Sequence, residues 1–86
     1  MNINELIAIV KNKIEAKIVI QSLKIEDKSF LHKNHKGNQE GKFHLKLTIN
    51  SEELAKKSKI ESTKKIYNIL DLELKEYIHS IQILFS

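Results

Sequence analysis

Residues 43–53 read FHLKLTINSEE, and this stretch decides the fold. Apolar and more polar side chains alternate from Phe43 to Ile49, and a period of two is typical of a strand with one buried face. Ser51 then precedes two acids, so its hydroxyl can cap a helix whose first turn favours negative charge. The stretch therefore predicts a half-buried strand that passes directly into a helix.

The residues before this stretch predict one helix and a second strand. An apolar stripe with helical spacing and a capping-box pattern at Asn2 and Glu5 predict a helix over residues 2–16. The β-branched run that follows predicts a strand near residues 18–27. Residues 30–42 hold both glycines and predict a loop, across which the two strands should pair antiparallel.

The residues after the stretch predict a short basic segment, a longer helix and a final strand. The helix should place on one apolar face Ile60, Tyr67, Leu70 and Leu74, with Ile66 and Ile69 beside it. Residues 79–85 alternate as a strand does. The element order is thus α-β-β-α-α-β, and a three-stranded sheet with helices on one face forms a two-layer α+β sandwich. A chain of 86 residues should form a single domain, residues 1–86.

The composition excludes several kinds of chemistry. The chain contains no Cys, which rules out disulfides and thiolate ligands or nucleophiles within it. It has no Gly-flanked serine and no phosphate-binding glycine loop, so we expect no enzymatic activity and no small-molecule substrate. A secretory signal pattern and a membrane-spanning apolar run are also absent, which favours a cytoplasmic protein that works by binding partners.

Two histidines in the loop are candidate metal ligands. His32 and His35 lie three residues apart, and imidazole suits zinc, copper and iron. Two histidines do not complete a tetrahedral site, so either a partner supplies further ligands or both are exposed loop residues without a metal. His44 falls on the polar face of its strand and His79 begins the final strand, where we expect surface or structural roles.

All 15 basic residues are lysines, and the net charge is +4. Lysine provides a mobile point charge without the planar fork of arginine, so nucleic-acid binding would depend on phosphate contacts. The candidate contacts to double-stranded DNA are Lys56, Lys57, Lys59, Lys64 and Lys65, here called the lysine corner, with Lys33 and Lys36 in the loop. The alternative is that these lysines only cover a solvated face.

Five short segments follow one another in a recognisable order. They are residues 25–29 (IEDKS), His32 with Gly37, residues 44–49 (HLKLTI) before Ser51, Ile66-Tyr67 before Leu70, and residues 78–81 (IHSI). Each segment resembles part of the pattern of BolA-like proteins, and the resemblance extends over nearly the whole chain. It implies a type II KH-like fold, in agreement with the element order above.

The resemblance implies two functions. The first is an adaptor for a monothiol glutaredoxin that shares a [2Fe–2S] cluster, with His32 as the loop ligand, in iron–sulfur cluster assembly and trafficking or in iron regulation. The second is a DNA-binding transcriptional regulator of morphology and the stress response. The family histidine expected as the second cluster ligand falls on Thr63, whose hydroxyl is a poor replacement for imidazole on iron. Both functions expect the loop and the lysine corner to form one docking surface.

Overall fold

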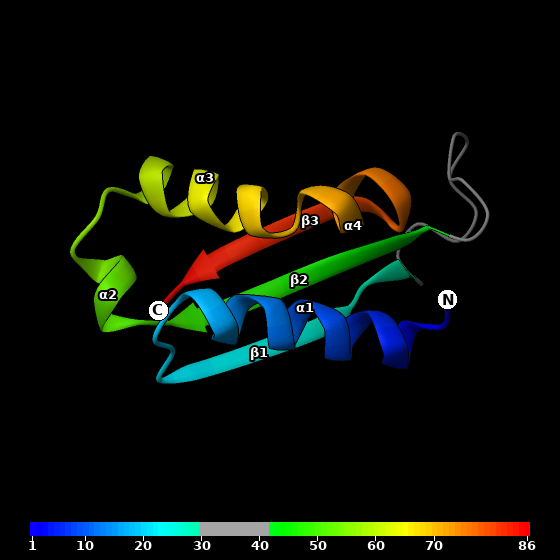
Figure 1. Ribbon diagram of the computed structural model, residues 1–86, viewed down its shortest axis with the longest axis horizontal. Coiled ribbons are helices and arrows are strands. Elements are labelled where there is room, and N and C mark those ends of the chain that lie inside the picture. The colour runs from blue at the N-terminus through cyan, green and yellow to red at the C-terminus, as the bar shows by residue number, and fades with distance from the viewer. Residues whose placement is uncertain (30–41) are drawn as a thin grey trace.

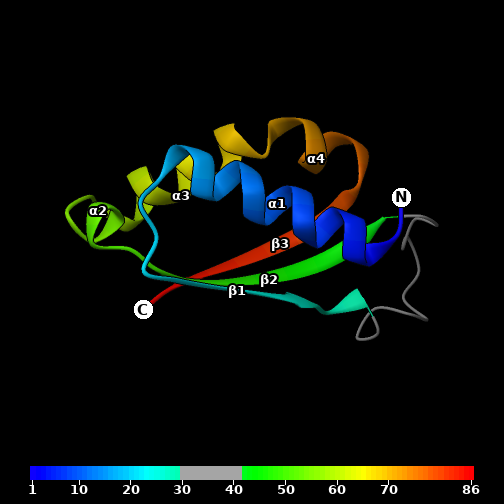
Figure 2. The same cartoon turned by 60° about the horizontal axis from the view of Figure 1, so that its bottom comes forward.

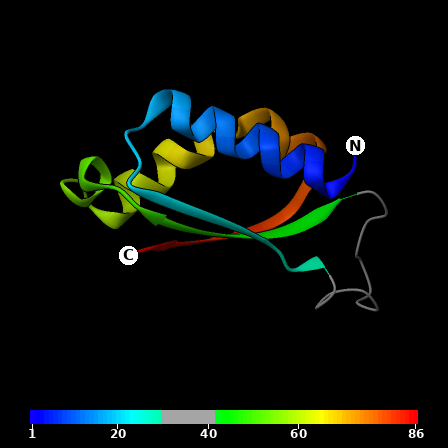
Figure 3. The same ribbon diagram turned by 90° about the horizontal axis from the view of Figure 1, so that it is seen from below.

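The computed structural model describes residues 1–29 and 42–86, which form a two-layer α+β sandwich (Figure 1). The elements are α1 (Ile3–Lys17), β1 (Ser22–Asp27), β2 (Phe43–Asn50), α2 (Glu52–Ala55), α3 (Lys59–Ile69), α4 (Asp71–Glu76) and β3 (Ile78–Phe85). Figures 2 and 3 show α1, α3 and α4 on the same face of the sheet. The predicted fold class is confirmed. The loop candidates His32, His35, Lys33 and Lys36 lie outside the described residues.

The three strands lie in the order β1-β2-β3, so β2 is central. β1 pairs antiparallel with β2, as predicted, and Ile25 faces Leu47 across this ladder. β2 and β3 are parallel, with Leu47 beside Ile83. Parallel neighbours need a crossover connection, which α2, α3 and α4 provide. The predicted order of elements holds, except that the last predicted helix is divided at Leu70 into α3 and α4.

β1 begins at Ser22, later than the predicted start at residue 18. The Ile18 side chain is instead buried in the core after the end of α1. The carbonyl of Val19 accepts a hydrogen bond from Ser51 Oγ at 2.7 Å, and the Gln21 side chain accepts one from the Glu52 N–H at 2.8 Å. These bonds tie the connection to the start of α2, and the Val19 carbonyl is satisfied outside the β-ladder.

The core lies between the helices and the sheet. It comprises Leu6, Val10 and Ile14 of α1, Leu45, Leu47 and Ile49 of β2, Ile66 of α3, and Ile18, Leu54, Leu70 and Ile78 at or near the ends of elements. Asn2 Oδ1 accepts from the Glu5 N–H at 2.8 Å and starts α1, as its sequence pattern predicts. In the part of the chain that the structure describes, no helix is long and apolar enough to cross a membrane.

The predicted buried face is only half correct, since Leu70 is buried and Leu74 packs against the core. Ile60 and Tyr67 are 68% and 43% exposed, whereas Ser62 and Ile66 are buried. Ser62 tolerates burial because its Oγ donates a hydrogen bond to the Leu54 carbonyl at 3.1 Å. The helix is therefore rotated relative to the prediction, and a satisfied serine takes a core position that the pattern assigned to larger apolar side chains.

Candidate functional site

Two histidines from neighbouring strands contact each other at one end of the sheet. The His44 and His79 ring centroids are 4.9 Å apart, with 58° between the ring planes. The sequence predicts surface or structural roles for both histidines: His44 is only 5% exposed and is structural, whereas His79 is exposed at the surface. His44 Nδ1 lies 2.6 Å from Ser80 Oγ, and the tautomer of the ring decides which group donates. The buried ring therefore has a fixed position behind the exposed one.

An irregular strand pairing presents His79. Phe43 pairs with Ile78 but the next residue, His44, pairs with Ser80, so His79 is the extra residue on β3. An extra residue interrupts the alternation of a strand and re-aims its side chain, and such irregularities are common beside functional sites. The sequence of β3 alone could not reveal this position, because the irregularity exists only in the register between two strands.

The histidine pair lies where the chain enters and leaves residues 30–41. The His44 N–H donates to Ser29 Oγ at 3.1 Å, and the His44 carbonyl accepts from the Lys28 N–H at 2.7 Å. We call this region the histidine end and define it by Ser29, His44, His79 and Ser80. A hollow of about 360 Å³ begins here on the sheet; Lys28, Lys46 and Gln82 also line it. His32 and His35 belong to the segment that this end delimits.

The described residues contain no group of three or more His, Cys, Asp or Glu side chains placed to hold a metal ion. The histidine end supplies one exposed imidazole, His79, and one buried imidazole that is hydrogen-bonded to Ser80. This donor set does not form a complete site, but it suits a centre to which a second chain brings the remaining ligands, because imidazole is a common iron ligand.

The lysine corner lies around α2 and the start of α3. Lys56, Lys57, Lys59 and Lys64 are exposed. Lys65 differs because its Nζ lies 3.1 Å from Glu53 Oε2. The hydrogen bonds from Lys65 and from the Val19 N–H hold the pKa of Glu53 below its ordinary value. The structure thus brings the predicted lysines together, but one of them is paired within the fold.

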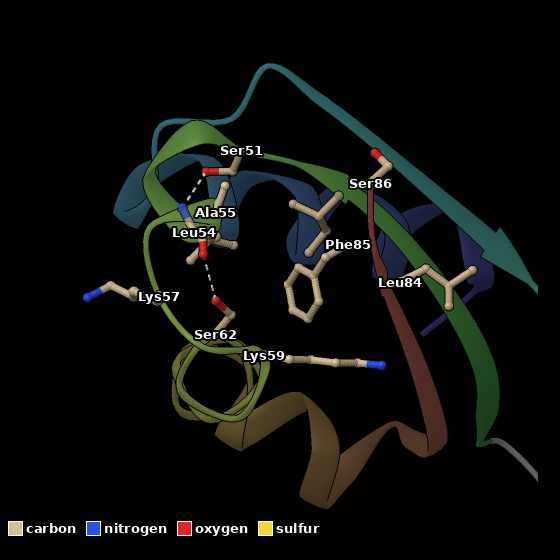
Figure 4. A pocket seen from close by; sticks show the side chains of 10 residues that line it. Ser51, Leu54, Ala55, Lys57, Lys59, Ser62, Leu84, Phe85 and Ser86 are labelled. Carbon is tan, nitrogen blue, oxygen red and sulfur yellow. Dashed lines mark hydrogen bonds between the residues drawn. The ribbon is translucent and has the colours of Figure 1, made fainter.

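A pocket of about 260 Å³ separates α2 and α3 from the end of β3 (Figure 4). Phe85 and Leu54 give it apolar walls, and Lys57 and Lys59 lie at its rim. Two of its three serines form hydrogen bonds within the fold: Ser51 Oγ caps α2 through the Leu54 N–H at 3.2 Å, and Ser62 Oγ donates to the Leu54 carbonyl. These two hydroxyls support the corner.

The histidine end and the start of the lysine corner lie at opposite ends of the sheet, which Figure 1 shows along its long axis. β2 connects them, and a strand of eight residues spans about 25 Å. Thr63, the expected position of a second cluster ligand, lies on α3 and lines one hollow with Lys59 and Lys64. The histidine end and the start of the lysine corner therefore form separate surfaces, while the loop expected to share a docking surface with the lysine corner lies outside the described residues.

Comparison with known proteins places this fold in a family. The BolA-like protein family model matches residues 14–85, and a search of curated proteins gives no match. The BolA domain of SufE1 from Arabidopsis thaliana is 27% identical, with a TM-score of 0.77 over 100% of this chain and 93% of that chain. BolA1 from Arabidopsis thaliana is 23% identical, with a TM-score of 0.78 over 92% of this chain and 87% of that chain.

A mouse structure has the same fold. The BolA1 protein from Mus musculus is 18% identical, with a TM-score of 0.71, and the alignment covers 90% of this chain and 60% of that chain. The resemblance found in the five sequence segments is therefore confirmed by a family model that covers most of the chain and by the shared fold. The chain belongs to the BolA-like protein family.

Proposed function

We propose that this chain is a non-catalytic adaptor that binds a monothiol glutaredoxin and contributes imidazole ligation to a [2Fe–2S] cluster shared between the two proteins. The observation that carries the proposal is the exposed His79 ring, which an irregular strand pairing presents and the buried His44 ring supports. Cluster assembly and trafficking, or iron regulation, are the processes in which such an adaptor would act.

Each residue of the histidine end has a distinct part in this proposal. His79 is the ligand, because it is exposed and stands beside the start and end of residues 30–41. His44 is a positioning residue: its hydrogen bond to Ser80 Oγ fixes its ring, which in turn limits the rotation of His79. His32 remains the predicted second ligand from the loop, and thiolates of the glutaredoxin complex supply the others.

The donor set determines what this chain adds to the cluster. Histidine ligation raises the reduction potential of a [2Fe–2S] centre relative to ligation by thiolates alone. A histidine must be neutral to bind iron, and mild acid protonates imidazole. A cluster with histidine ligands should therefore be released at a higher pH than a cluster with thiolate ligands only. The chain itself has no Cys, so it depends on its partner for every thiolate.

The test of this function is visible circular dichroism of a cluster-loaded monothiol glutaredoxin mixed with this chain. The wild-type chain should change the spectrum, and His79→Ala should abolish that change while calorimetry still detects binding to the cluster-free partner. Leu84→Ala, an exposed residue at the other end of the same strand, is the matched control and should behave as wild type. An unchanged spectrum with the wild-type chain refutes the adaptor function. If the His79→Ala variant gives the same spectrum as wild type, the assignment of His79 as a cluster ligand is wrong, but the adaptor function stands.

DNA binding is the second candidate function, and four exposed lysines of the lysine corner favour it. Contacts to phosphate release counterions, so the logarithm of affinity should fall by about one unit per contact for each tenfold rise in salt. Lys57→Gln with Lys59→Gln should reduce this slope. Lys11→Gln with Lys17→Gln on α1 is the control, because it also removes two exposed positive charges. A flat salt dependence removes DNA binding as a function.

A further inference from the structure

The outer face of α3 carries two apolar side chains that the core does not use. Ile60 is 68% exposed and Tyr67 is 43% exposed. They are seven residues apart, which is close to two helical turns, so they lie on one line along the helix. Single exposed apolar residues are ordinary on protein surfaces. An aligned pair marks an interaction surface when the protein surface between the two side chains forms a groove.

The surface between Ile60 and Tyr67 forms a groove. A shallow groove of about 480 Å³ is lined by Lys59, Ile60, Thr63, Lys64, Tyr67 and Asn68, which we call the outer stripe. All six residues belong to α3, so the groove follows the helix. Thr63 occupies the middle and is smaller than its neighbours, which lets a partner approach the helix there. The helix does not depend on this face for its position, because Ser62 and Ile66 anchor the opposite one.

Charge decides what kind of partner fits the outer stripe. Lys59 and Lys64 border the groove, and among the described residues neither forms an ion pair. Lys56 and Lys57 add positive charge at the N-terminal end of α3, while Glu61 is the one acid within the helix. An occupant therefore needs acidic groups at its margins and apolar groups at its centre. An acidic amphipathic helix has this arrangement.

Double-stranded DNA fits this surface less well. Its backbone offers phosphates to the lysines but no apolar group to cover Ile60, which would lie in the middle of the contact. A protein helix satisfies both requirements, because apolar side chains at every third or fourth residue would meet Ile60 and Tyr67 while flanking carboxylates meet Lys59 and Lys64. We propose that the outer stripe of α3 is a docking surface for an acidic amphipathic helix of a partner protein.

This surface is separate from the histidine end, since α3 begins at the far end of the sheet. The inference therefore goes beyond the adaptor function: one chain would hold a glutaredoxin at one end and a second, acidic partner at the other. Binding at the outer stripe should not require His79, and cluster ligation should not require Ile60.

The probe is a fluorescein-labelled synthetic peptide with leucines on one helical face and glutamates on both margins. Its control has the same composition with the leucines scattered around the helix. Fluorescence anisotropy should show that the amphipathic peptide binds about tenfold or more tightly than the scattered one, since only the first can cover both apolar residues. Equal binding of the two peptides overturns the proposal, because it would mean that charge alone is recognised.

Variants of the chain locate the site. Ile60→Ser should weaken binding of the amphipathic peptide about fivefold to tenfold. Leu72→Ser, on α4 and 55% exposed, is the matched control and should leave binding unchanged. Lys59→Gln with Lys64→Gln should weaken binding more at low salt than at high salt. Equal affinities for the Ile60→Ser variant and the wild-type chain overturn the assignment. Ile60 is exposed, so thermal melting should show a folded variant.

Two further measurements separate this proposal from the others. His79→Ala should retain full peptide binding, and Ile60→Ser should retain the wild-type cluster spectrum, so either function can fail without the other. A DNA duplex is then titrated against the bound peptide. If the duplex displaces the peptide at equal concentration and its own binding is unaffected by Ile60→Ser, the lysines serve nucleic acid and the proposal is wrong.

Discussion

The inner face of α3 buries a serine, whereas the outer face of the same helix exposes an isoleucine and a tyrosine. Ser62 is accepted in the core because the Leu54 carbonyl accepts a hydrogen bond from its Oγ, and Ile66 is fully buried. Ile60 and Tyr67 receive no such support from the fold. The difference shows that a polar side chain can be buried when a hydrogen-bond partner is within reach. It also shows that apolar side chains can remain exposed at the surface, where other molecules can bind them.

The largest expected effect separates two isoleucines of this helix. Ile66→Ala should lower the free energy of unfolding by about 2–5 kcal/mol, because it leaves a cavity in a fully buried site. Ile60→Ala should change it by no more than about 0.5 kcal/mol, as exposed substitutions usually do. Urea denaturation of both variants measures the contrast. Similar losses would mean that the outer face also contributes to the core.

The second effect concerns a buried carboxylate in the helical layer. Glu73 is 3% exposed and its Oε2 lies 2.6 Å from Lys13 Nζ, while its Oε1 has no hydrogen-bond partner within the described residues. Lys13→Met leaves the carboxylate uncompensated and should destabilise the fold by about 1–3 kcal/mol. The cost stays below that of a fully buried pair, because Lys13 is 40% exposed and water screens it.

A double variant is the control for this pair. Lys13→Met with Glu73→Leu removes both charges and should restore most of the lost stability, since apolar packing replaces a costly buried ion pair. Thermal or urea unfolding of the two single variants, the double variant and the wild-type chain gives the four free energies of unfolding that a double-mutant cycle requires. A double variant as unstable as the sum of the singles would show that the two side chains do not interact.

The third effect is the loss of the serine anchor. Ser62→Ala should destabilise the fold by about 1 kcal/mol, because the buried Leu54 carbonyl loses one of its hydrogen bonds and keeps that from the Lys57 N–H. Thr63→Ala, on the outer side, should cost clearly less. Equal changes for the two variants in urea unfolding would remove the distinction between the faces. If Ser62→Ala instead raises the free energy of unfolding, the hydrogen bond from Ser62 to the Leu54 carbonyl does not stabilise the fold.

The smallest effect belongs to an ion pair near the surface. The folded-state pKa of Glu53 is lowered from 4.5, mainly by the hydrogen bond from Lys65 and then by that from the Val19 N–H. Its contribution to stability is therefore present above pH 4.5 and is lost as the pH falls through the folded-state pKa. Glu53→Gln has no carboxylate to make this contribution. The difference in free energy of unfolding between wild type and Glu53→Gln should therefore become smaller as the pH is lowered. Urea unfolding at several pH values measures it; a constant gap contradicts the assignment.

The fold could be predicted from the sequence because its signals are local. The alternation from Phe43 to Ile49, the Asn2 cap and the Ser51 cap each depend on neighbours within a few residues. The structure has both caps, and it has the alternating strand except at His44, which is buried. The family resemblance added long-range order that local patterns lack. The face of α3 could not be obtained in this way, because Ser62 becomes a core residue only through a carbonyl eight positions earlier.

The candidate site was predictable only in part for a similar reason. The lysines of the lysine corner are near one another in sequence, so their clustering was apparent, while the pairing of Lys65 with Glu53 depends on how α2 meets α3. The histidine end joins residues 36 positions apart, through His44 and Ser80. An extra residue on β3 then sets the direction of His79, and no pattern within one strand records the register between two.

The strand order has a consequence for aggregation. β3 lies at an edge of the described sheet and reads IHSIQILF, without a single charge, proline or glycine, whereas the other edge strand carries Lys24, Glu26 and Asp27. Uncharged edge strands pair readily with copies of themselves once partial unfolding uncovers them. Heating a concentrated solution should therefore produce β-rich aggregates that begin at β3, and Gln82→Lys should delay their light scattering.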